Sequence, residues 1–313
     1  MAKNLKKESK FAPKPVTIAV MGPTGAGKTT FINVASGSDF RVGVGLESCT
    51  DAMQFSQPFQ LDNYSITLID TPGFDDTSKT DAEVLNMVTE FFSSQYEKGQ
   101  LLNGIIYMHR ISDNRMGGTA VRNFRFFKQL CGDDFLPSSA IVTNMWGEIA
   151  PEVGVVREQE LFGKDIFFKS AIDAGASPFR HANTAESAHV ILRHLAGSAP
   201  KVMLIQKELV DEKKPIYATA AGAALLGEIA EREKKHQERL EELRKEMDEA
   251  VKAQDEEDMR ELEEARAALA AEQAKLQMQK RLLEEASRPS APRPQSFFMV
   301  LLLKLTPCVR RSL

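Results

Sequence analysis

At 313 residues, with 42% apolar residues and a formal net charge of −4 at pH 7, the chain can hold one sizeable globular domain and an extension. The slightly acidic balance gives no electrostatic basis for nucleic-acid binding, so we expect no nucleic-acid partner. Three cysteines, Cys49, Cys131 and Cys308, are far apart and lack C-x-x-C spacing. They indicate reduced thiols, not a disulfide framework or a zinc site, and they predict a cytoplasmic protein.

The two end segments carry no export or membrane signal. Residues 1–14 are basic and polar, without the apolar core of a secretory signal, and predict a disordered leader. The apolar run Phe297–Leu305 is too short to cross a bilayer and contains Lys304. No transmembrane segment is therefore expected.

The strongest motif lies between a predicted strand over 15–21 and a predicted helix over Thr29–Ser36. Its residues fit G-x-x-x-x-G-K-[ST] at every fixed position. Glycines let backbone N–H groups turn inward around an anion, and the helix N-terminus favours negative charge at the same place. Lys28 supplies a cation for the β- and γ-phosphates, and the Thr29 hydroxyl can ligand Mg²⁺. The predicted phosphate-binding residues are Gly22, Pro23, Thr24, Gly25, Ala26, Gly27, Lys28, Thr29 and Thr30.

A second motif, Asp70-Thr-Pro-Gly73, follows a predicted antiparallel hairpin of residues 52–60 and 64–70. A carboxylate at the carboxyl end of a buried strand is placed to support Mg²⁺ beside a phosphate loop, which assigns Asp70 to the metal. Gly73 can bring a bare backbone N–H to the γ-phosphate. The two motifs together predict a site for a nucleoside triphosphate.

The loop between the motifs contains two hydroxyl side chains that could close on Mg²⁺ when the γ-phosphate is present. Thr50 is the first candidate for this switch threonine, and Ser48 is the competitor. The predicted metal residues are thus Thr29, Thr50 and Asp70, and the residues assigned to the reaction are Lys28, Thr50 and Gly73.

These motifs resemble the first three signature motifs of the translation-factor-class GTPases. The DTPGF form and the short SCT element before the hairpin are most similar to the septin-like branch, which includes the immunity-associated GTPases and the chloroplast import receptors. The resemblance covers residues 15–198. It implies a three-layer α/β P-loop fold, GTP or GDP with Mg²⁺ as cofactors, and GTP hydrolysis.

Strands alternate with helices through the rest of this region, which predicts a mostly parallel sheet covered on both faces. The predicted strands are Leu102–Met108, Ser139–Met145 and Asp165–Lys169, and the predicted helices are Asp81–Ser94, Val121–Leu130 and Thr184–Leu195. In the second of these helices, Arg122, Arg125 and Lys128 are expected on the outside.

Basic residues follow the strand at 102–108, namely His109, Arg110 and Arg115. In septin-like relatives such residues often face a second nucleotide-bound domain, which implies a homodimer and a trans-acting cation. A surface loop held by local ion pairs is the alternative.

The base-reading segment departs from the family pattern. The Asn/Thr-Lys-x-Asp element would fall on Thr143, Asn144 and Trp146, with asparagine in place of lysine and tryptophan in place of the carboxylate. Trp146 could stack on a purine, and Ser170-Ala171 resembles the segment whose backbone contacts the base. The residues indicate a purine triphosphate, and GTP rests on the resemblance, so an ATP-binding P-loop protein stays open.

Hydrolysis is expected to be slow because Phe74, not glutamine, follows Gly73. Asp75, Asp76, Thr77 or a partner group would have to orient the attacking water. The two functional hypotheses are a nucleotide-controlled assembly or regulatory switch and a non-hydrolysing, nucleotide-bound scaffold.

Residues 199–287 predict a helical extension. Leucines recur every seven residues from Leu262 to Leu283, whereas Leu240, Leu243 and Met247 form an earlier stripe in a different phase. The companion seam positions of this repeat are Ala265, Glu272 and Gln279, which are weak seam residues, so the pattern does not establish a continuous two-stranded coiled coil. We expect a long helix that dimerises, contacts a helical partner through 225–287 or rests against the P-loop domain, and a flexible tail over 288–313.

Overall fold

The computed structural model describes residues 12–42, 52–73, 79–114, 116–253 and 256–286. One seven-stranded sheet forms the centre, in the order β2-β4-β1-β5-β6-β7, with β3 also paired to β4. The strands are β1 Lys14–Met21, β2 Gln54–Phe55, β3 Phe59–Leu61, β4 Tyr64–Asp70, β5 Gly104–Arg110, β6 Ser139–Asn144 and β7 Ser177–Arg180. The five longer strands run parallel, and β2 and β3 pair antiparallel with β4.

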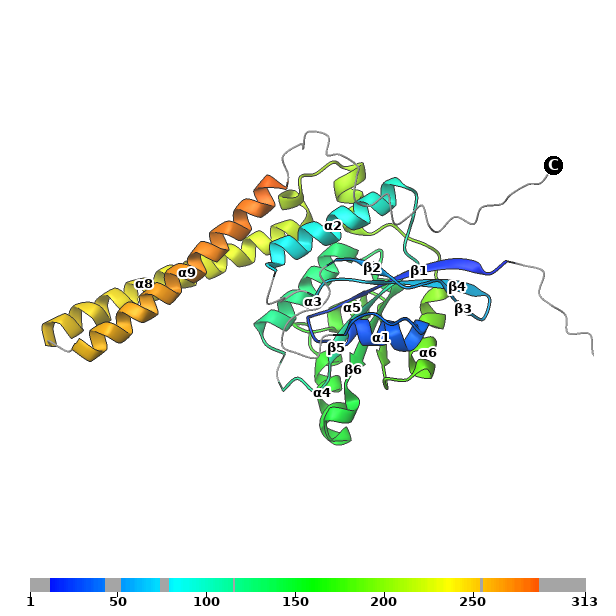
Figure 1. The fold of residues 1–313 in the computed structure, drawn as a ribbon, viewed down its shortest axis with the longest axis horizontal. Coiled ribbons are helices and arrows are strands. Elements are labelled where there is room, and N and C mark those ends of the chain that lie inside the picture. The colour runs from blue at the N-terminus through cyan, green and yellow to red at the C-terminus, as the bar shows by residue number, and fades with distance from the viewer. Residues whose placement is uncertain (1–11, 43–51, 74–78, 115, 254–255, 287–313) are drawn as a thin grey trace, which may run out of the picture.

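Helices cover both faces of this sheet (Figure 1). One apolar core joins it to α1 and α6, and a larger core joins its other face to α2, α3, α4 and α5. The bounds are α1 Lys28–Ser36, α2 Asp81–Glu97, α3 Gly118–Cys131, α4 Pro151–Gly163, α5 Lys169–Asp173 and α6 Ala185–Ala196, with 3₁₀ turns η1 Leu136–Ser138 and η2 Trp146–Glu148. The predicted three-layer α/β fold with a mostly parallel sheet is confirmed.

The predicted hairpin is present, with an irregularity that the sequence pattern did not reveal. The pairing Phe55↔Ile69 is followed by Phe59↔Ile66, so the first strand has one more residue than β4 between these pairs. Ser56 accommodates it, because its N–H donates to the Leu68 carbonyl at 2.8 Å and its hydroxyl accepts from the Leu68 N–H at 2.9 Å. This is the geometry of a β-bulge.

The predicted strand Asp165–Lys169 is wrong. The segment is a turn that leads into α5, and the last parallel strand is β7. Phe168 explains the difference, because its fully buried ring packs edge-on against Phe124 with centroids 4.5 Å apart, while Ile166 is 64% exposed. The segment thus buries a single aromatic side chain, and its side chains do not alternate between two faces as those of a strand do.

The expected exposure of the three cations on α3 is wrong for one of them. Arg122 is buried and pairs with Asp81 at 3.2 Å and with Glu228 at 3.6 Å. The side chain of Arg125 is 55% exposed, in agreement with the prediction.

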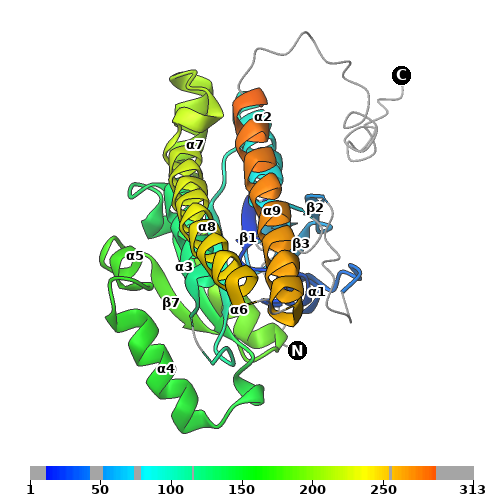
Figure 2. The ribbon, with the colours of Figure 1, turned by 90° about the vertical axis from the view of Figure 1, so that its left-hand side faces the viewer.

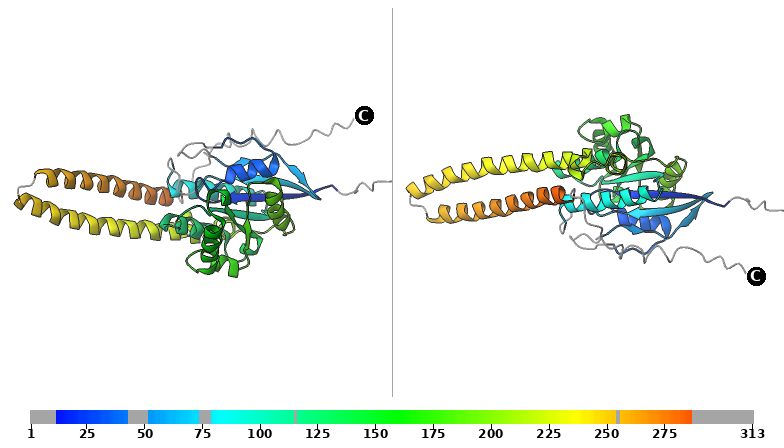
Figure 3. Two further views of the ribbon diagram at one scale, coloured as in Figure 1. Left: turned by 90° about the horizontal axis from the view of Figure 1, so that it is seen from below. Right: turned by 90° about the horizontal axis from the view of Figure 1, so that it is seen from above.

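The extension is a pair of antiparallel helices, α8 Ala220–Ala253 and α9 Glu256–Glu285, which we call the helical arm. They project from one end of the sheet domain as two adjacent rods (Figure 3). Short turns precede the arm, namely α7 Leu204–Gln206, the π-helical η3 Lys207–Asp211 and the 3₁₀ turn η4 Ile216–Ala218. The reversal of direction accounts for the phase change between the two leucine stripes.

The base of the arm is built into the larger core. Helix α9 packs beside α2, and α8 packs beside α3 (Figure 2). Leu225 and Ile229 of α8 and Leu276 and Leu283 of α9 are buried in this core. The expectation that the extension rests against the P-loop domain is thus confirmed for the arm's base. In the described part of the chain, no helix combines the length and apolar character needed to cross a membrane.

Candidate functional site

The phosphate-binding motif forms a tight loop between β1 and α1, at the carboxyl edge of the sheet. Gly27 has φ +83° and precedes the first helical residue, Lys28. A Cβ on Gly27 would lie 2.5 Å from Nδ2 of Asn144, so only glycine lets the loop approach the end of β6 this closely. The N-terminus of α1 therefore faces the concave side of a backbone loop, which is the arrangement that binds anions.

Lys28 folds back over this loop. Its ammonium donates to the carbonyls of Gly22 and Pro23 at 3.1 and 3.0 Å, and the residue is buried. A cation fixed against the backbone of an anion-binding loop is ready to move onto a polyphosphate, so the residues present fit the group that the motif implies.

Thr29 and Asp70 supply the two oxygens suited to Mg²⁺. The Thr29 hydroxyl donates to Oδ2 of Asp70 at 2.7 Å, and Asp70 is fully buried at the end of β4. Parallel pairing brings them together, because Asp70 lies opposite Val20 on β1. Thr71 fixes the strand end by donating to the Val20 carbonyl at 2.9 Å. Hard oxygen ligands of this kind are those that Mg²⁺ prefers.

Gly73 lies against the phosphate-binding loop. A Cβ at this position would be 2.4 Å from Oγ1 and 2.7 Å from the backbone nitrogen of Thr24. The end of the Asp70–Gly73 segment therefore meets the backbone of the phosphate-binding loop. Thr30 lies on α1, one residue beyond Thr29.

Asn144 connects the end of β6 to the same loop. Its Nδ2 donates to the Ala26 carbonyl at 3.3 Å, and its Oδ1 accepts from the Met145 N–H at 2.7 Å. Asn144 therefore acts here as a bridge between two loops and not as a replacement for a lysine. The indole N–H of Trp146 donates to Oγ1 and the carbonyl of Thr143 at 3.1 and 3.2 Å, which fixes the ring beside the strand end.

Comparison with known proteins agrees with this geometry. Residues 17–123 match the family model described as 50S ribosome-binding GTPase. This is the fold of a P-loop GTPase. No curated protein sequence matches the chain significantly.

Solved structures of GTPases show similarity at low sequence identity. Toc33 from Arabidopsis thaliana, in complex with Mg²⁺ and GMPPNP, is 15% identical over 61% of this chain and 89% of that chain, with a TM-score of 0.47. The elongation factor SelB from Methanococcus maripaludis, with GPPNHP, is 16% identical over 61% of this chain and 36% of that chain, with a TM-score of 0.41.

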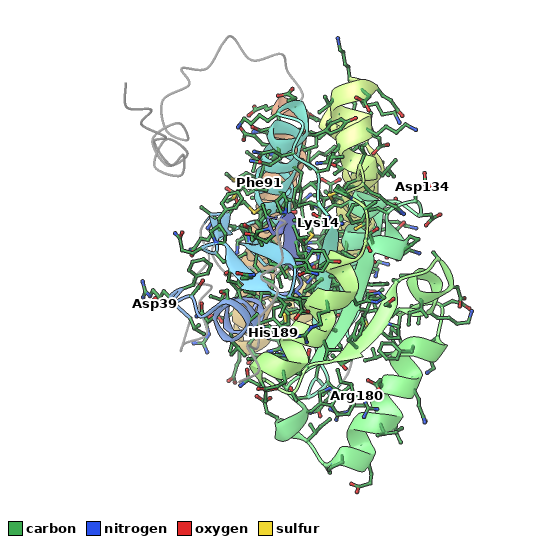
Figure 4. The ribbon with its side chains drawn as sticks, turned by 90° about the vertical axis from the view of Figure 1, so that its right-hand side faces the viewer. Lys14, Asp39, Phe91, Asp134, Arg180 and His189 are labelled. Carbon is green, nitrogen blue, oxygen red and sulfur yellow. The ribbon has the colours of Figure 1, made fainter. Side chains whose placement is uncertain are left out.

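Two residues beside Trp146 in the P-loop GTPase domain escaped sequence reasoning. The guanidinium of Arg180, a residue labelled in Figure 4, lies 4.2 Å from the centre of the Trp146 ring. It also forms a two-pronged ion pair with Glu158, which joins β7 to α4. Glu158 also accepts from Oγ1 of Thr143 at 3.2 Å. No local motif marks either residue, and the last strand was predicted at residues 165–169 and not at β7. A Cβ on Gly154 of α4 would lie 2.7 Å from Cζ3 of Trp146, so a purine that stacks on Trp146 has to share the ring with α4 and Arg180.

Ser170 and Ala171 do not follow a strand, contrary to the prediction. They lie on α5, where the Ser170 hydroxyl accepts from the Lys128 ammonium at 2.9 Å and Ala171 is buried. The segment that does follow the last strand is residues 181–183, beyond β7. Ser170 and Ala171 therefore lack the position after a strand on which their predicted base contact depended.

The sequence pattern placed His109 and Arg110 in a loop after the strand. In the structure both residues belong to β5. His109 is buried, and this burial, helped by the adjacent Arg110 cation, lowers its pKa to about 4. The imidazole is therefore uncharged at neutral pH and cannot be a cationic catalyst. Thr50, Ser48, residues 74–77 and Arg115 lie outside the described residues.

Proposed function

We propose that this chain is a guanine-nucleotide-binding protein that holds GTP or GDP with Mg²⁺ on the loop of residues 22–29. The observation that carries the proposal is the Thr29–Asp70 contact of 2.7 Å beside a buried Lys28. In a P-loop fold this places a hydroxyl, a carboxylate and an ammonium around one anion-binding loop. The match of residues 17–123 to a GTPase family model supports guanine as the base.

Each residue has a distinct task in this proposal. Lys28 neutralises the β- and γ-phosphates, Thr29 ligands Mg²⁺, and Asp70 orients the metal's outer ligands. Thr50 would be the further metal ligand, as expected from the sequence, and Gly73 would offer its N–H to the γ-phosphate. Bound Mg²⁺ supplies charge neutralisation at the phosphates. Thr143, Asn144, Trp146 and the loop after β7 are proposed to surround the base.

We further propose that the nucleotide controls the helical arm, as a septin-like switch with slow hydrolysis and a homodimeric active form would. Two contacts support this. Helix α2 begins at Asp81, soon after Gly73, and Asp81 shares Arg122 with Glu228 of the arm. Helix α9 packs on α2. A shift of the Gly73 segment would thus reach both helices of the arm. Dimerization is important for the GTPase activity of the chloroplast translocon components atToc33 and psToc159, and one solved chain described in these terms is 14% identical to this chain.

Titration calorimetry tests the binding proposal. Wild-type protein with Mg²⁺ should bind GDP and GMPPNP, and K28A should lose at least tenfold in affinity, because a charge-assisted contact to phosphate is removed. ATP in competition separates guanine from general purine binding. Absence of heat with every purine nucleotide, or unchanged binding in K28A, would refute the proposal.

The alternative function is a nucleotide-bound scaffold that does not hydrolyse GTP and assembles through α8 and α9. The observation in its favour is Phe74 at the position where a water-orienting glutamine would stand. Single-turnover assays with radiolabelled GTP distinguish the two. Phosphate release that rises with protein concentration supports the dimeric switch, whereas no release over hours supports the scaffold.

A further inference from the structure

Arg110 reaches the phosphate-binding loop of its own chain. It is the last residue of β5, and this strand passes directly beside the loop. A Cβ on Gly25 would lie 3.3 Å from Nη1 and 4.0 Å from Cζ of Arg110, so the guanidinium covers the backbone in the middle of the loop. Gly25 has φ +76°, and its lack of a side chain leaves the space that the guanidinium uses.

An acidic side chain lies beside the guanidinium. Nε of Arg110 forms an ion pair with Oδ1 of Asp113 at 3.0 Å. Asp113 occupies a loop that is fixed to α4, because Arg157 donates to the carbonyls of Ile111 and Ser112 at 3.0 and 2.9 Å and to Asn114 at 2.8 Å. The ion pair involves Nε, whereas Nη1 is the guanidinium nitrogen nearest to Gly25.

The neighbouring imidazole does not compete for this role. His109 is uncharged, because burial lowers its pKa to about 4, and it packs against the Phe168 ring at 5.3 Å. Arg110 is therefore the cation that β5 delivers to the loop in addition to Lys28 of α1. The sequence left open a partner-directed role for this residue or a merely local ion pair, and the geometry gives a third reading.

We propose that Arg110 contacts the β- and γ-phosphates of the nucleotide bound to its own chain, and that Asp113 is its positioning residue. The inference rests on the proposed nucleotide site and adds a second cation to it. During hydrolysis, water attacks the γ-phosphorus and the bond to the β–γ bridging oxygen breaks. The bond's electron pair remains on the β-phosphate of GDP, and both protons of the water end on inorganic phosphate as H₂PO₄⁻. Arg110 stabilises the charge that develops on the bridging side.

The first test compares R110A, R110K and the control R244A, which changes an exposed arginine of the distant arm. We expect R110A to bind GMPPNP about tenfold more weakly and to hydrolyse GTP about 100-fold more slowly in single turnover. R110K should keep part of both activities, and R244A should equal the wild type. Unchanged binding and hydrolysis in R110A overturn the inference while the proposed function stands. Absence of nucleotide binding in the wild type overturns both.

The second test separates action on the same chain from action on a partner. K28A should bind nucleotide at least tenfold more weakly but still carries Arg110, so at a GTP concentration that fills R110A and leaves K28A largely empty it can donate this arginine to the GTP-loaded R110A chain. We expect no recovery of hydrolysis when K28A is added to R110A. Recovery toward the wild-type rate shows a partner-directed arginine and overturns the inference.

The positioning role of Asp113 has its own readout. D113N should reduce the rate of single-turnover hydrolysis, whereas D113E should keep a rate close to that of the wild type. Thermal unfolding of both variants should be close to the wild type because the Asp113 side chain is only partly buried. Equal loss in D113N and D113E, or no loss in either, contradicts a positioning role.

Discussion

At the scale of single residues, the proposed site depends on backbone approach as much as on charge. Lys28, Thr29 and Asp70 could be assigned from the sequence because each occupies a fixed place in a motif whose chemistry requires that residue type. Glu158 and Arg180 could not, because their ion pair joins a helix and a strand 22 residues apart without a local signature. Gly73 is a further residue that its motif allowed us to assign from the sequence.

Replacement of Gly73 by alanine should weaken nucleotide binding at least tenfold. The new methyl group would lie 2.7 Å from the Thr24 backbone nitrogen, so the phosphate-binding loop or the Asp70–Gly73 segment has to move. Calorimetry with GMPPNP measures the effect. The matched control is G227A on α8, where a Cβ meets nothing within 4 Å, and this change should stabilise the fold by about 0.5–1 kcal/mol through helix propensity. Equal nucleotide affinity in G73A and wild type would contradict the close approach.

The stability of the protein should fall as pH decreases from about 6.5 towards 4. Burial lowers the pKa of His109 to about 4 from an ordinary value of 6.5, so the unfolded chain binds a proton in this range that the folded chain does not. Urea unfolding at pH 7, 5.5 and 4.5 measures the loss, which can reach roughly 3 kcal/mol for one fully buried imidazole. His181, whose pKa burial also lowers to about 4, adds to the trend. H109Q should flatten the pH dependence, and an unchanged slope would show that His109 does not contribute.

At the scale of helices and strands, sequence patterns located most elements but not all. The strand and helix around the phosphate motif, the hairpin and α6 were found because their periodicity and end signals agree. Strand β7 was missed because four residues that include Pro178 give too little alternation. The false strand at 165–169 was an apolar run whose burial depends on one ring, Phe168, in the core. Short apolar runs cannot be distinguished by period alone.

Arg122 is the element-scale contact that the helical pattern misjudged. It joins α3, the first residue of α2 and Glu228 of α8, whose pKa burial raises above its ordinary value. Removal of one partner from a buried ion pair typically costs about 3–5 kcal/mol, so R122M should be strongly destabilised in urea unfolding. R125A removes a largely exposed cation that pairs with the same Glu228 and should cost less than about 1 kcal/mol. Similar losses in the two variants would show that burial of Arg122 has no special effect.

At the scale of the whole molecule, the helical arm is part of the domain's core and not an independent appendage. The sequence showed two leucine stripes of different phase, and a reversal of chain direction explains both. It could not show which stripe returns to the domain, because Leu276 and Leu283 obtain their burial from α2 and α8, which are distant in sequence.

Leu276→Ala should loosen the base of the arm. The side chain is 2% exposed, and truncation of a buried leucine costs about 2–5 kcal/mol. Hydrogen exchange should increase in α9 and α2 more than in β1 or β5. Leu269→Ala, at a half-buried position farther along the arm, is the control and should leave exchange in α2 unchanged. If L276A leaves α2 as protected as in the wild type, the contact between α9 and α2 does not stabilise that helix.

The antiparallel arm also has a mechanical consequence. Helix α9 has 30 residues, and at 1.5 Å of rise per residue it is about 45 Å long. Because both helices are anchored at the same end, a tilt of about 10° at α2 would swing the far end by about 8 Å, on the geometry of a rigid helix of that length. A sub-ångström adjustment next to a phosphate group could in this way become a displacement as large as the separation of two packed helices.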